Sequence, residues 1–271
     1  MWIDTHCHLD AHEFGGESLA VARRAAQAGV SMIVIPAVDR HNFAVVAQLA
    51  GEAENTSYAL GIHPIYVSNT AEDDLAIMRH AVEAALADPR FVAVGEIGLD
   101  YFIPMLCEPA MREKQEYFFR EQLRIARDFD LPVLMHVRRS QDQVLKHVRQ
   151  IRPAGGIAHA FNGSFQQAQA FIDLGFKLGF GGAMTFTRAL QIRRLAATLP
   201  LESIVLETDA PDISPAWIHP ARNSPEYLPA IGELLAELRQ LETDEVRSAT
   251  MRAAIAAMPR LSAILPQATQ A

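Results

Sequence analysis

The sequence predicts an α/β fold, a closed (β/α)8 barrel of the TIM type, over the whole chain of 271 residues. Short runs rich in Val, Ile and Leu alternate with longer segments of helical period, which is typical of a parallel sheet wrapped by helices. The alternation occurs eight times, and eight such units most economically close into a barrel, although a doubly wound open sheet has a similar pattern. We expect a single domain, 1–271, because barrels of roughly this size fold as one unit.

The predicted strands are the eight apolar runs Trp2–His6, Ser31–Ala37, Tyr58–His63, Val92–Ile97, Pro132–Val137, Gly156–Phe161, Lys177–Gly181 and Ser203–Thr208. Amphipathic stretches between and after them predict helices, among them 18–29, 73–89, 113–130, 188–200, 226–240 and 244–259. Long irregular stretches follow the fourth strand (103–111) and the eighth (209–225). Loops after the strands form the functional face of a barrel, so we expect both at the active site.

The composition excludes several classes of protein. With 50% hydrophobic and 21% charged residues the chain resembles a globular protein rather than a disordered one. A net charge of -8 argues against a broad basic surface, so a phosphate-bearing substrate must be gripped locally. The chain starts without a secretory signal pattern and has no apolar run of about 20 residues, so we expect a cytoplasmic protein without membrane spans. Cys7 and Cys107 are too few for a disulfide framework, and we expect no bridge between them.

Metal-binding residue types recur at the predicted strand ends. In chain order they are His6 and His8, His63, Glu96, His136, His159 and Asp209. Carboxyl ends of parallel strands meet at one rim, so these side chains should converge there. Only 10 of 271 residues are histidines, which makes such a distribution improbable by accident. Strand side chains alternate between faces, so His6 and His8 should point the same way and Cys7 the other.

Imidazoles combined with carboxylates suit divalent cations such as Zn²⁺, Mn²⁺, Fe²⁺ or Ni²⁺, with Mg²⁺ also considered, and we expect two cations. Glu96 is the predicted bridging carboxylate, because the run VAVGEIGLD has a glutamate and no lysine. Asp209 is predicted to bind one cation and to accept a proton as general base, its alternative being the cap of a turn. Glu96 and Asp209 are therefore the predicted catalytic residues.

Other residues near these strand ends have less certain roles. His63 in GIHP could simply cap a turn, and otherwise it is equally consistent with a metal ligand and with a substrate contact. Glu207 and Asp4 are predicted to orient ligands, Asp4 acting on His6. Arg138, next to His136, is predicted to bind substrate phosphate, and of Arg138 and Arg139 one should point to solvent. The remaining histidines are predicted to lie on the surface; they are His12, His41, His80, His147 and His219. For His219, which is close in sequence to the active-site face, the alternative is a contact with substrate.

Six motifs carry a resemblance to a known family: DTHCHLD, GIHP, GEIGLDY, LPVLMHVRRS, IAHAFNGS and LETDAPD. In this order they resemble the TatD-type metal-dependent hydrolases, which include deoxyribonucleases and have an amidohydrolase-like barrel. The likeness runs from Ile3 to about Tyr227. It implies that His6, His8, Glu96 and Asp209 bind one metal, that Glu96, His136 and His159 bind the second, and that His63 lies near the substrate phosphate.

The sequence departs from the family at two places. After GLDY it reads Phe102, Ile103 and Pro104, where many relatives have further tyrosine and arginine, and near the C-terminus it reads MRAAIAAMPRL instead of an asparagine-rich pattern.

The expected function is hydrolysis of a phosphodiester, as a deoxyribonuclease that acts 3'–5' on single-stranded DNA, through a hydroxide held by the cations. DNA or another phosphodiester is thus the expected partner, and a monomer is plausible. One alternative is an amidohydrolase-like reaction on an amide or ester, since an activated water attacks carbonyl carbon as well. The other is a metal-binding protein without catalytic activity.

Overall fold

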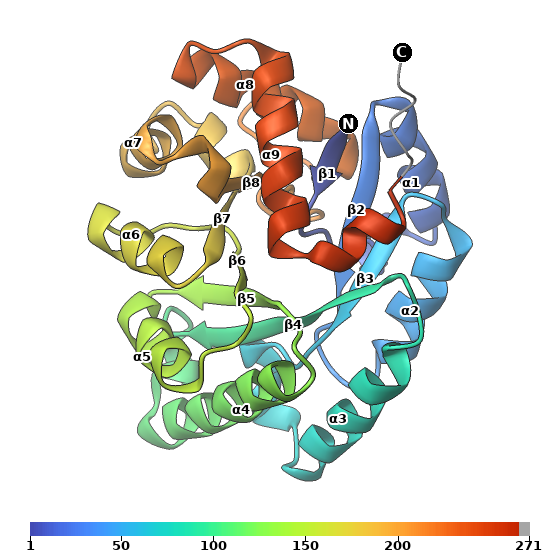
Figure 1. Ribbon diagram of the computed structural model, residues 1–271, viewed down its shortest axis with the longest axis vertical. Helices are drawn as coiled ribbons and strands as arrows, with labels where there is room; N and C mark the ends of the chain where they lie inside the picture. Colours follow the sequence, from blue (N-terminus) through green and yellow to red (C-terminus); the bar gives the residue numbers. More distant parts are fainter. Residues whose placement is uncertain (266–271) are drawn as a thin grey trace.

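The computed structural model describes residues 1–265 and consists of a ring of parallel strands surrounded by helices (Figure 1). The strands are β1 Trp2–Asp4, β2 Val30–Pro36, β3 Thr56–Leu60, β4 Phe91–Asp100, β5 Val133–Arg138, β6 Gly156–Ala158, β7 Phe176–Phe180 and β8 Ile204–Leu206. Each pairs in parallel with the next, in the order β1 to β8. The predicted (β/α)8 architecture is confirmed.

Backbone hydrogen bonds between the ends of the sheet bring β1 and β8 together. The amide of Thr5 donates to the carbonyl of Leu206 at 3.1 Å, and the amide of Asp209 donates to the carbonyl of His6 at 2.8 Å. The buried Asp4 carboxylate adds a link, because its two oxygens accept from the amide and the hydroxyl of Thr208 at 3.0 and 2.6 Å. The first and last strands are thereby fixed beside each other, which places His6 next to Asp209.

The helices cover the outside of the ring, as the alternation of segments predicts (Figure 1). They are α1 Ser18–Gln27, α2 Phe43–Glu52, α3 Asp73–Ala85, α4 Pro109–Asp128, α5 Gln141–Ile151, α6 Phe165–Asp173, α7 Leu190–Thr198, α8 Leu228–Arg239 and α9 Thr243–Ala257. Short 3-10 turns include η3 Pro104–Cys107 and η7 Pro259–Ala263. Residues 103–111, expected as an irregular loop, therefore contain η3 and the first turn of α4.

Several strands end earlier than the sequence predicts. The predicted strands run on to His6, His63, Phe161 and Thr208, whereas β1, β3, β6 and β8 end at Asp4, Leu60, Ala158 and Leu206. Beyond these points the pairing becomes irregular. The amide of His63 donates to the carbonyl of Val38 at 2.8 Å, in the loop after β2, whereas the amide of His159 still donates to Met135 of β5 at 3.0 Å. The histidines of these strands thus lie just past the ladder, at the mouth of the barrel.

The amino end of the barrel interior is apolar and closed. Side chains from the strands, among them Ile3, Met32 and Leu134, form one cluster with Met258, which lies between α9 and η7, and with Leu261 of η7. Figure 1 shows α9 lying in front of β1 and β8 at this end. The C-terminal segment MRAAIAAMPRL, which departs from the family pattern, therefore serves to cover the barrel floor.

Two further expectations concern helices and cysteines. In the part of the chain that the structure describes, no helix is long and apolar enough to cross a membrane. Cys7 is buried and Cys107 partly exposed, and both are free, as predicted.

Candidate metal centre

Glu96, on β4, lies at the centre of the histidine cluster at the barrel mouth. Its carboxylate is almost fully buried, and its two oxygens face different histidines. Oε2 lies 3.0 Å from His6 Nε2 and 3.3 Å from His8 Nε2. Oε1 lies 2.9 Å from His159 Nε2 and 3.1 Å from His136 Nδ1. One carboxylate thus connects two groups of imidazoles that come from opposite parts of the chain.

Asp209 completes the group on the β1 side. Its Oδ1 is 3.6 Å from His6 Nε2 and 3.7 Å from His8 Nε2, and these three ligand atoms lie within 4.8 Å of one another. The side chains of His8 and Asp209 are 21% and 14% exposed, whereas that of His6 is fully buried. The centre therefore opens to solvent on the side of His8 and Asp209, where a substrate can reach it.

Two glycines allow the strands around this cluster to approach closely. A Cβ on Gly98, which has a φ of +153°, would lie 2.0 Å from the carbonyl oxygen of His136. A Cβ on Gly179 would lie 2.1 Å from Oε2 of Glu207. Any larger residue at either position would push apart the strands that carry the functional side chains, which accounts for glycine in GEIGLD and in KLGFGG.

His136 is held in one tautomer by Asp100, at the end of β4. The buried carboxylate of Asp100 accepts a hydrogen bond from His136 Nε2 at 2.9 Å, and also from the amides of Phe102 and Ile103. Because Nε2 carries the proton, the lone pair of the neutral ring is on Nδ1, which faces Glu96. The ring therefore presents a ligand atom to the centre, in the arrangement that carboxylate-supported metal ligands adopt.

His159 has a similar arrangement with Glu207. Its Nδ1 lies 3.6 Å from Oε1 of the buried Glu207, while Nε2 points to Glu96. Glu207 is itself oriented by the amide of Ala160, which donates to the same oxygen. The carboxylate favours a proton on Nδ1, so Nε2 presents its lone pair to the centre. Glu207 thus lies where the sequence places an orienting residue.

His63 has the opposite tautomer. Its Nδ1 accepts a hydrogen bond from the amide of Ile65 at 3.2 Å, so the proton of the neutral ring is on Nε2. That Nε2 lies 3.3 Å from Oε1 of Glu96. A nitrogen that carries a proton can donate to an anion but has no lone pair for a cation. Of the two roles that the sequence leaves open, this geometry favours contact with a substrate.

Burial and mutual contact shift the pKa values of the cluster. Burial lowers the pKa of His6 to about 3 and that of His63 to about 4, so both rings are neutral near pH 7. Burial would also lower the pKa of His8, but its contacts with Glu96 and Asp209 raise it to about 9. Burial raises the pKa of Asp209 to about 6, although His159 and His8 lower it. Cation binding would therefore displace protons from rings such as His8.

The donor set fits divalent cations. Within the described residues, Glu96 forms ion pairs with imidazoles and with no lysine or arginine. Three clusters of three ligand atoms occur here: His6 with His8 and Asp209, His6 with Glu96 and His159, and His63 with Glu96 and His136. A mixture of imidazole nitrogens and carboxylate oxygens suits Zn²⁺, Mn²⁺, Ni²⁺ and Fe²⁺. A buried carboxylate whose two oxygens face different groups of ligands suits a position between two cations.

Comparison with known proteins agrees with this geometry. The family described as TatD related DNase matches residues 3–258. The chain belongs to the TatD family. An uncharacterized metal-dependent hydrolase of Escherichia coli K12, YjjV, is 41% identical over 92% of this chain and 95% of its own length. A second, from Haemophilus influenzae, is 36% identical over 92% of this chain and 96% of its own. The chain is thus a TatD-family metal-dependent hydrolase, as the six motifs indicate.

Solved structures extend the comparison to the fold. The crystal structure of YjjV, a TatD homologue from Escherichia coli K12, superposes with a TM-score of 0.89 at 39% identity and covers 95% of this chain and 98% of that one. A TatD-family hydrolase from Entamoeba histolytica has a TM-score of 0.81 at 18% identity over 95% and 97%. An organophosphorus hydrolase from Deinococcus radiodurans shares the fold, with a TM-score of 0.59 at 14% identity over 94% and 92%. The TatD hydrolase therefore has the eight-stranded parallel barrel that its sequence predicts.

The arginines after β5 lie at the edge of the TatD centre. Arg138 is about half exposed and 3.9 Å from Asp100, and its guanidinium carbon lies 3.9 Å from the ring centre of Phe102. Arg139 also lies over this ring, at 4.7 Å. Phe102 is itself 43% exposed. Phe102 thus lies beneath the guanidinium groups of both arginines, and both arginines are exposed, whereas the sequence predicts that one of the two points to solvent.

One prediction about a carboxylate needs correction, and one carboxylate was missed. Asp4 does not contact the imidazole of His6; it accepts a hydrogen bond from the backbone amide of His6 at 3.3 Å and joins β1 to Thr208. The carboxylate that holds a ligand ring is Asp100, which sequence reasoning missed. Asp100 is four residues beyond Glu96, and side chains of a strand alternate, so the even spacing in GEIGLD was the available signal.

The prediction for His147 was wrong. His12, His41, His80 and His219 are exposed, but His147 is 2% exposed. On α5 it lies three residues after Val144 and one before Val148, hence on the buried face, where its Nε2 bonds Glu116 of α4 at 3.0 Å. The helical spacing of the apolar residues therefore contained the signal.

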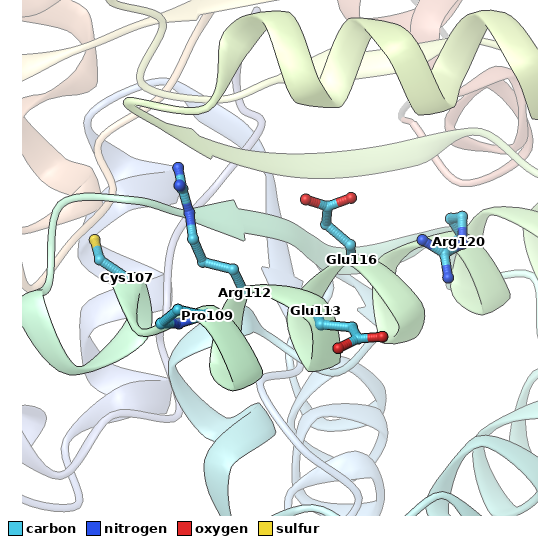
Figure 2. A pocket seen from close by; sticks show the side chains of 6 residues that line it. All are labelled: Cys107, Pro109, Arg112, Glu113, Glu116 and Arg120. Carbon is cyan, nitrogen blue, oxygen red and sulfur yellow. The ribbon is translucent and has the colours of Figure 1, made fainter.

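Glu116 also lines a cavity of about 380 Å³ beside the N-terminal half of α4, which includes Cys107, Arg112 and Arg120 and none of the metal-centre residues. Figure 2 shows Arg112 and Glu116 on one side of the helix and Glu113 on the other. Glu116 already accepts hydrogen bonds from Tyr101, Gln143 and His147. Its carboxylate therefore serves to join α4 to its neighbours.

Proposed function

We propose that this TatD hydrolase is a two-cation phosphodiesterase, a deoxyribonuclease that removes nucleotides from the 3' end of single-stranded DNA. The proposal depends on the position of Glu96, whose two carboxylate oxygens face different groups of imidazoles. A hydrogen-bond donor, His63, and an arginine, Arg138, lie beside these groups. His6, His8 and Asp209 would hold one cation on the Oε2 side, and His136 and His159 the second on the Oε1 side. When bound, the cations would supply an activated water and neutralise charge that develops on the phosphate.

The chain's own residues then have separate tasks. Nε2–H of His63 donates to a phosphate oxygen, in keeping with its tautomer. Arg138, at the rim, pairs with the same phosphate and orients it. Asp209 accepts the proton of the attacking water, because it is the carboxylate of the cluster that faces solvent and does not bridge the two groups. Asp100 and Glu207 keep two ligand rings in place throughout.

The arginines at the edge of the metal centre indicate which type of bond the enzyme cleaves. A carbonyl substrate would need one oxyanion contact, whereas a phosphodiester carries a full negative charge that Arg138 and Arg139 complement in an otherwise acidic protein. This is the observation that favours phosphodiester cleavage over the amidohydrolase-like reaction.

Digestion of a 5'-labelled single-stranded DNA oligonucleotide tests the proposal. With Mg²⁺, Mn²⁺ or Zn²⁺ supplied in turn, the wild-type protein should shorten the strand from its 3' end and yield a ladder. Asp209→Asn should slow the reaction by about 10²–10⁴-fold. Glu113→Gln, a matched change of an exposed carboxylate on α4, should leave the rate unchanged. An intact oligonucleotide with every cation, together with hydrolysis of an amide or carboxylic ester, would replace this proposal by the amidohydrolase-like one.

A further inference from the structure

The barrel mouth has a second cavity, of about 570 Å³, between the loop that follows β7 and the loop that follows β8. Six of the side chains that line it determine its chemistry: Phe186, Arg188, Ile192, Ile213, His219 and Arg222. We propose that this cavity is a substrate subsite that receives the nucleobase and phosphate of the nucleotide adjoining the scissile bond. The inference rests on the proposed function and specifies how the substrate is held.

The cavity is connected to the metal centre through the chain itself. Pro211 and Asp212, which line it, come two and three residues after Asp209, and the amide of Asp212 donates to the carbonyl oxygen of Asp209 at 2.9 Å. On the other side, the loop after β7 touches the same wall, because a Cβ on Gly182 would lie 2.0 Å from the carbonyl oxygen of Ile213. None of the metal-centre residues lines the cavity, but the backbone contact between Asp212 and Asp209 ties one of its walls to the loop that carries Asp209.

The lining matches a nucleotide in both of its parts. Phe186, Ile192 and Ile213 supply an aromatic and aliphatic wall, against which a base can stack. The guanidinium of Arg188 lies 5.6 Å above the Phe186 ring, and the ring of His219 meets Phe186 edge-on at 5.4 Å. Arg188 and Arg222 are exposed and outnumber Asp212, the one carboxylate of the lining. In a protein of net charge -8, this local excess of arginine complements an anion.

The two loops are fixed before any ligand binds. Asn223 is fully buried, and its Nδ2 donates to the carbonyl oxygens of Thr208 and Asp212 at 2.8 Å each. Thr185 Oγ1 accepts from the amide of Ala216 at 2.7 Å and so links the loop after β7 to the loop after β8. A cavity with walls held this way needs little ordering when a ligand enters, which favours binding.

The position of the cavity also agrees with a strand that crosses the mouth. The ring order places β8 opposite β4, and Phe102 with Arg138 and Arg139 lies at the β4–β5 side. Arginine and aromatic side chains thus stand on both sides of Glu96. A single strand that rests on both would place one phosphate over the centre and the next nucleotide in the cavity.

Equilibrium binding measured through tryptophan fluorescence tests the inference without turnover. Of the two tryptophans, Trp2 is 5% exposed in the core and Trp217 is 48% exposed in the loop after β8. Titration with dAMP and with deoxyribose 5-phosphate separates the base from the phosphate. We expect dAMP to bind about 10-fold more tightly than deoxyribose 5-phosphate. In Trp217→Phe the fluorescence change should disappear while calorimetry still detects ligand binding. This result would show that the fluorescence signal comes from the loop after β8.

Phe186→Ala should abolish the preference for dAMP, while Leu190→Ala, a matched change of a 75% exposed residue at the start of α7, should preserve it. Circular dichroism and the melting temperature establish that both variants are folded. Equal affinities for the two ligands in the wild type, or an unchanged preference in Phe186→Ala, would overturn the inference even if the enzyme degrades DNA. A preference that depends on Phe186 in a protein that leaves DNA intact would instead contradict only the proposed nuclease activity.

Discussion

The two ends of the barrel bury side chains of opposite chemistry inside the same ring of strands. At the amino end Met32, Leu134 and Met258 are fully buried among apolar neighbours. At the mouth the buried groups are imidazoles and carboxylates, and within residues 1–265 the atoms His6 Nδ1, His159 Nδ1 and Glu207 Oε2 have no hydrogen-bond partner. Burial of apolar surface stabilises the fold, whereas burial of polar groups costs free energy unless a ligand compensates it. The apolar amino end therefore mainly stabilises the fold, and the polar mouth supplies the groups for chemistry.

The largest effect should come from Glu96→Gln at the mouth. The loss of one charge from the carboxylate shared by both imidazole groups should lower DNA turnover by about 10³-fold or more. It should also remove the rise in melting temperature that Mn²⁺ produces in the wild type, because only a folded state that binds the cation is stabilised by it. Thermal melts with Mn²⁺ and with a chelator measure this. A variant that keeps the full Mn²⁺-dependent rise would show that the cation binds elsewhere.

The converse change is Met258→Ala at the barrel floor. Because Met258 is fully buried, the truncation should lower the free energy of unfolding by about 2–5 kcal/mol, as measured in urea. Turnover per folded molecule should not change. Met105→Ala, at a methionine that is 60% exposed, should alter stability by less than about 0.5 kcal/mol. A large loss of turnover in Met258→Ala at temperatures where it is folded would show that the two ends do not have separate roles.

Asp100→Asn addresses a residue that supports the mouth without facing the centre. It removes the charge that fixes the proton of His136 on Nε2, so Mn²⁺ affinity should fall by about 10–100-fold. Calorimetric titration with Mn²⁺ measures the affinity, and Asp142→Asn on α5 serves as the exposed control. If Asp100→Asn lowered the melting temperature but left Mn²⁺ affinity intact, the carboxylate would act on the loop at Phe102 and Ile103 rather than on the ring.

The smallest effect is expected outside both ends, at the contact between α4 and α5. His147→Ala removes one of three donors to Glu116 and should cost about 1 kcal/mol of stability, with no change in Mn²⁺ affinity or turnover. His80→Ala, on the exposed face of α3, is the control. A change in Mn²⁺ affinity in His147→Ala would mean that the two helices influence the mouth.

The sequence predicted more of the architecture than of the contacts. Alternating apolar runs and amphipathic segments are local signals, so the eight strands and the set of histidines at their ends could be found without a structure. The partners of those histidines could not be found as easily, because they depend on register and on where the strands end. Asp100, which decides which nitrogen of His136 faces Glu96, is 36 residues away from it in sequence. The amide of Ile65 does the same for His63 from only two residues away, so the turn after GIHP did contain that signal.

The role of Asp4 illustrates the same limit. An aspartate two residues before His6 is a reasonable partner for its ring, but the closure of the barrel brings Thr208 to it instead, at a separation of 204 residues. The cavity after β7 and β8 was equally out of reach, since its two walls are brought together by Asn223 and Thr185 through long-range bonds. His147, by contrast, could have been placed correctly from the helical spacing alone.

The most direct test of the account is anomalous diffraction from crystals of the wild-type protein grown with Mn²⁺. Two Mn²⁺ peaks should lie on either side of the Glu96 carboxylate, one beside His6, His8 and Asp209 and the other beside His136 and His159, with His63 in contact with neither. Peaks elsewhere in the protein, or His63 Nε2 bound directly to manganese, would contradict it.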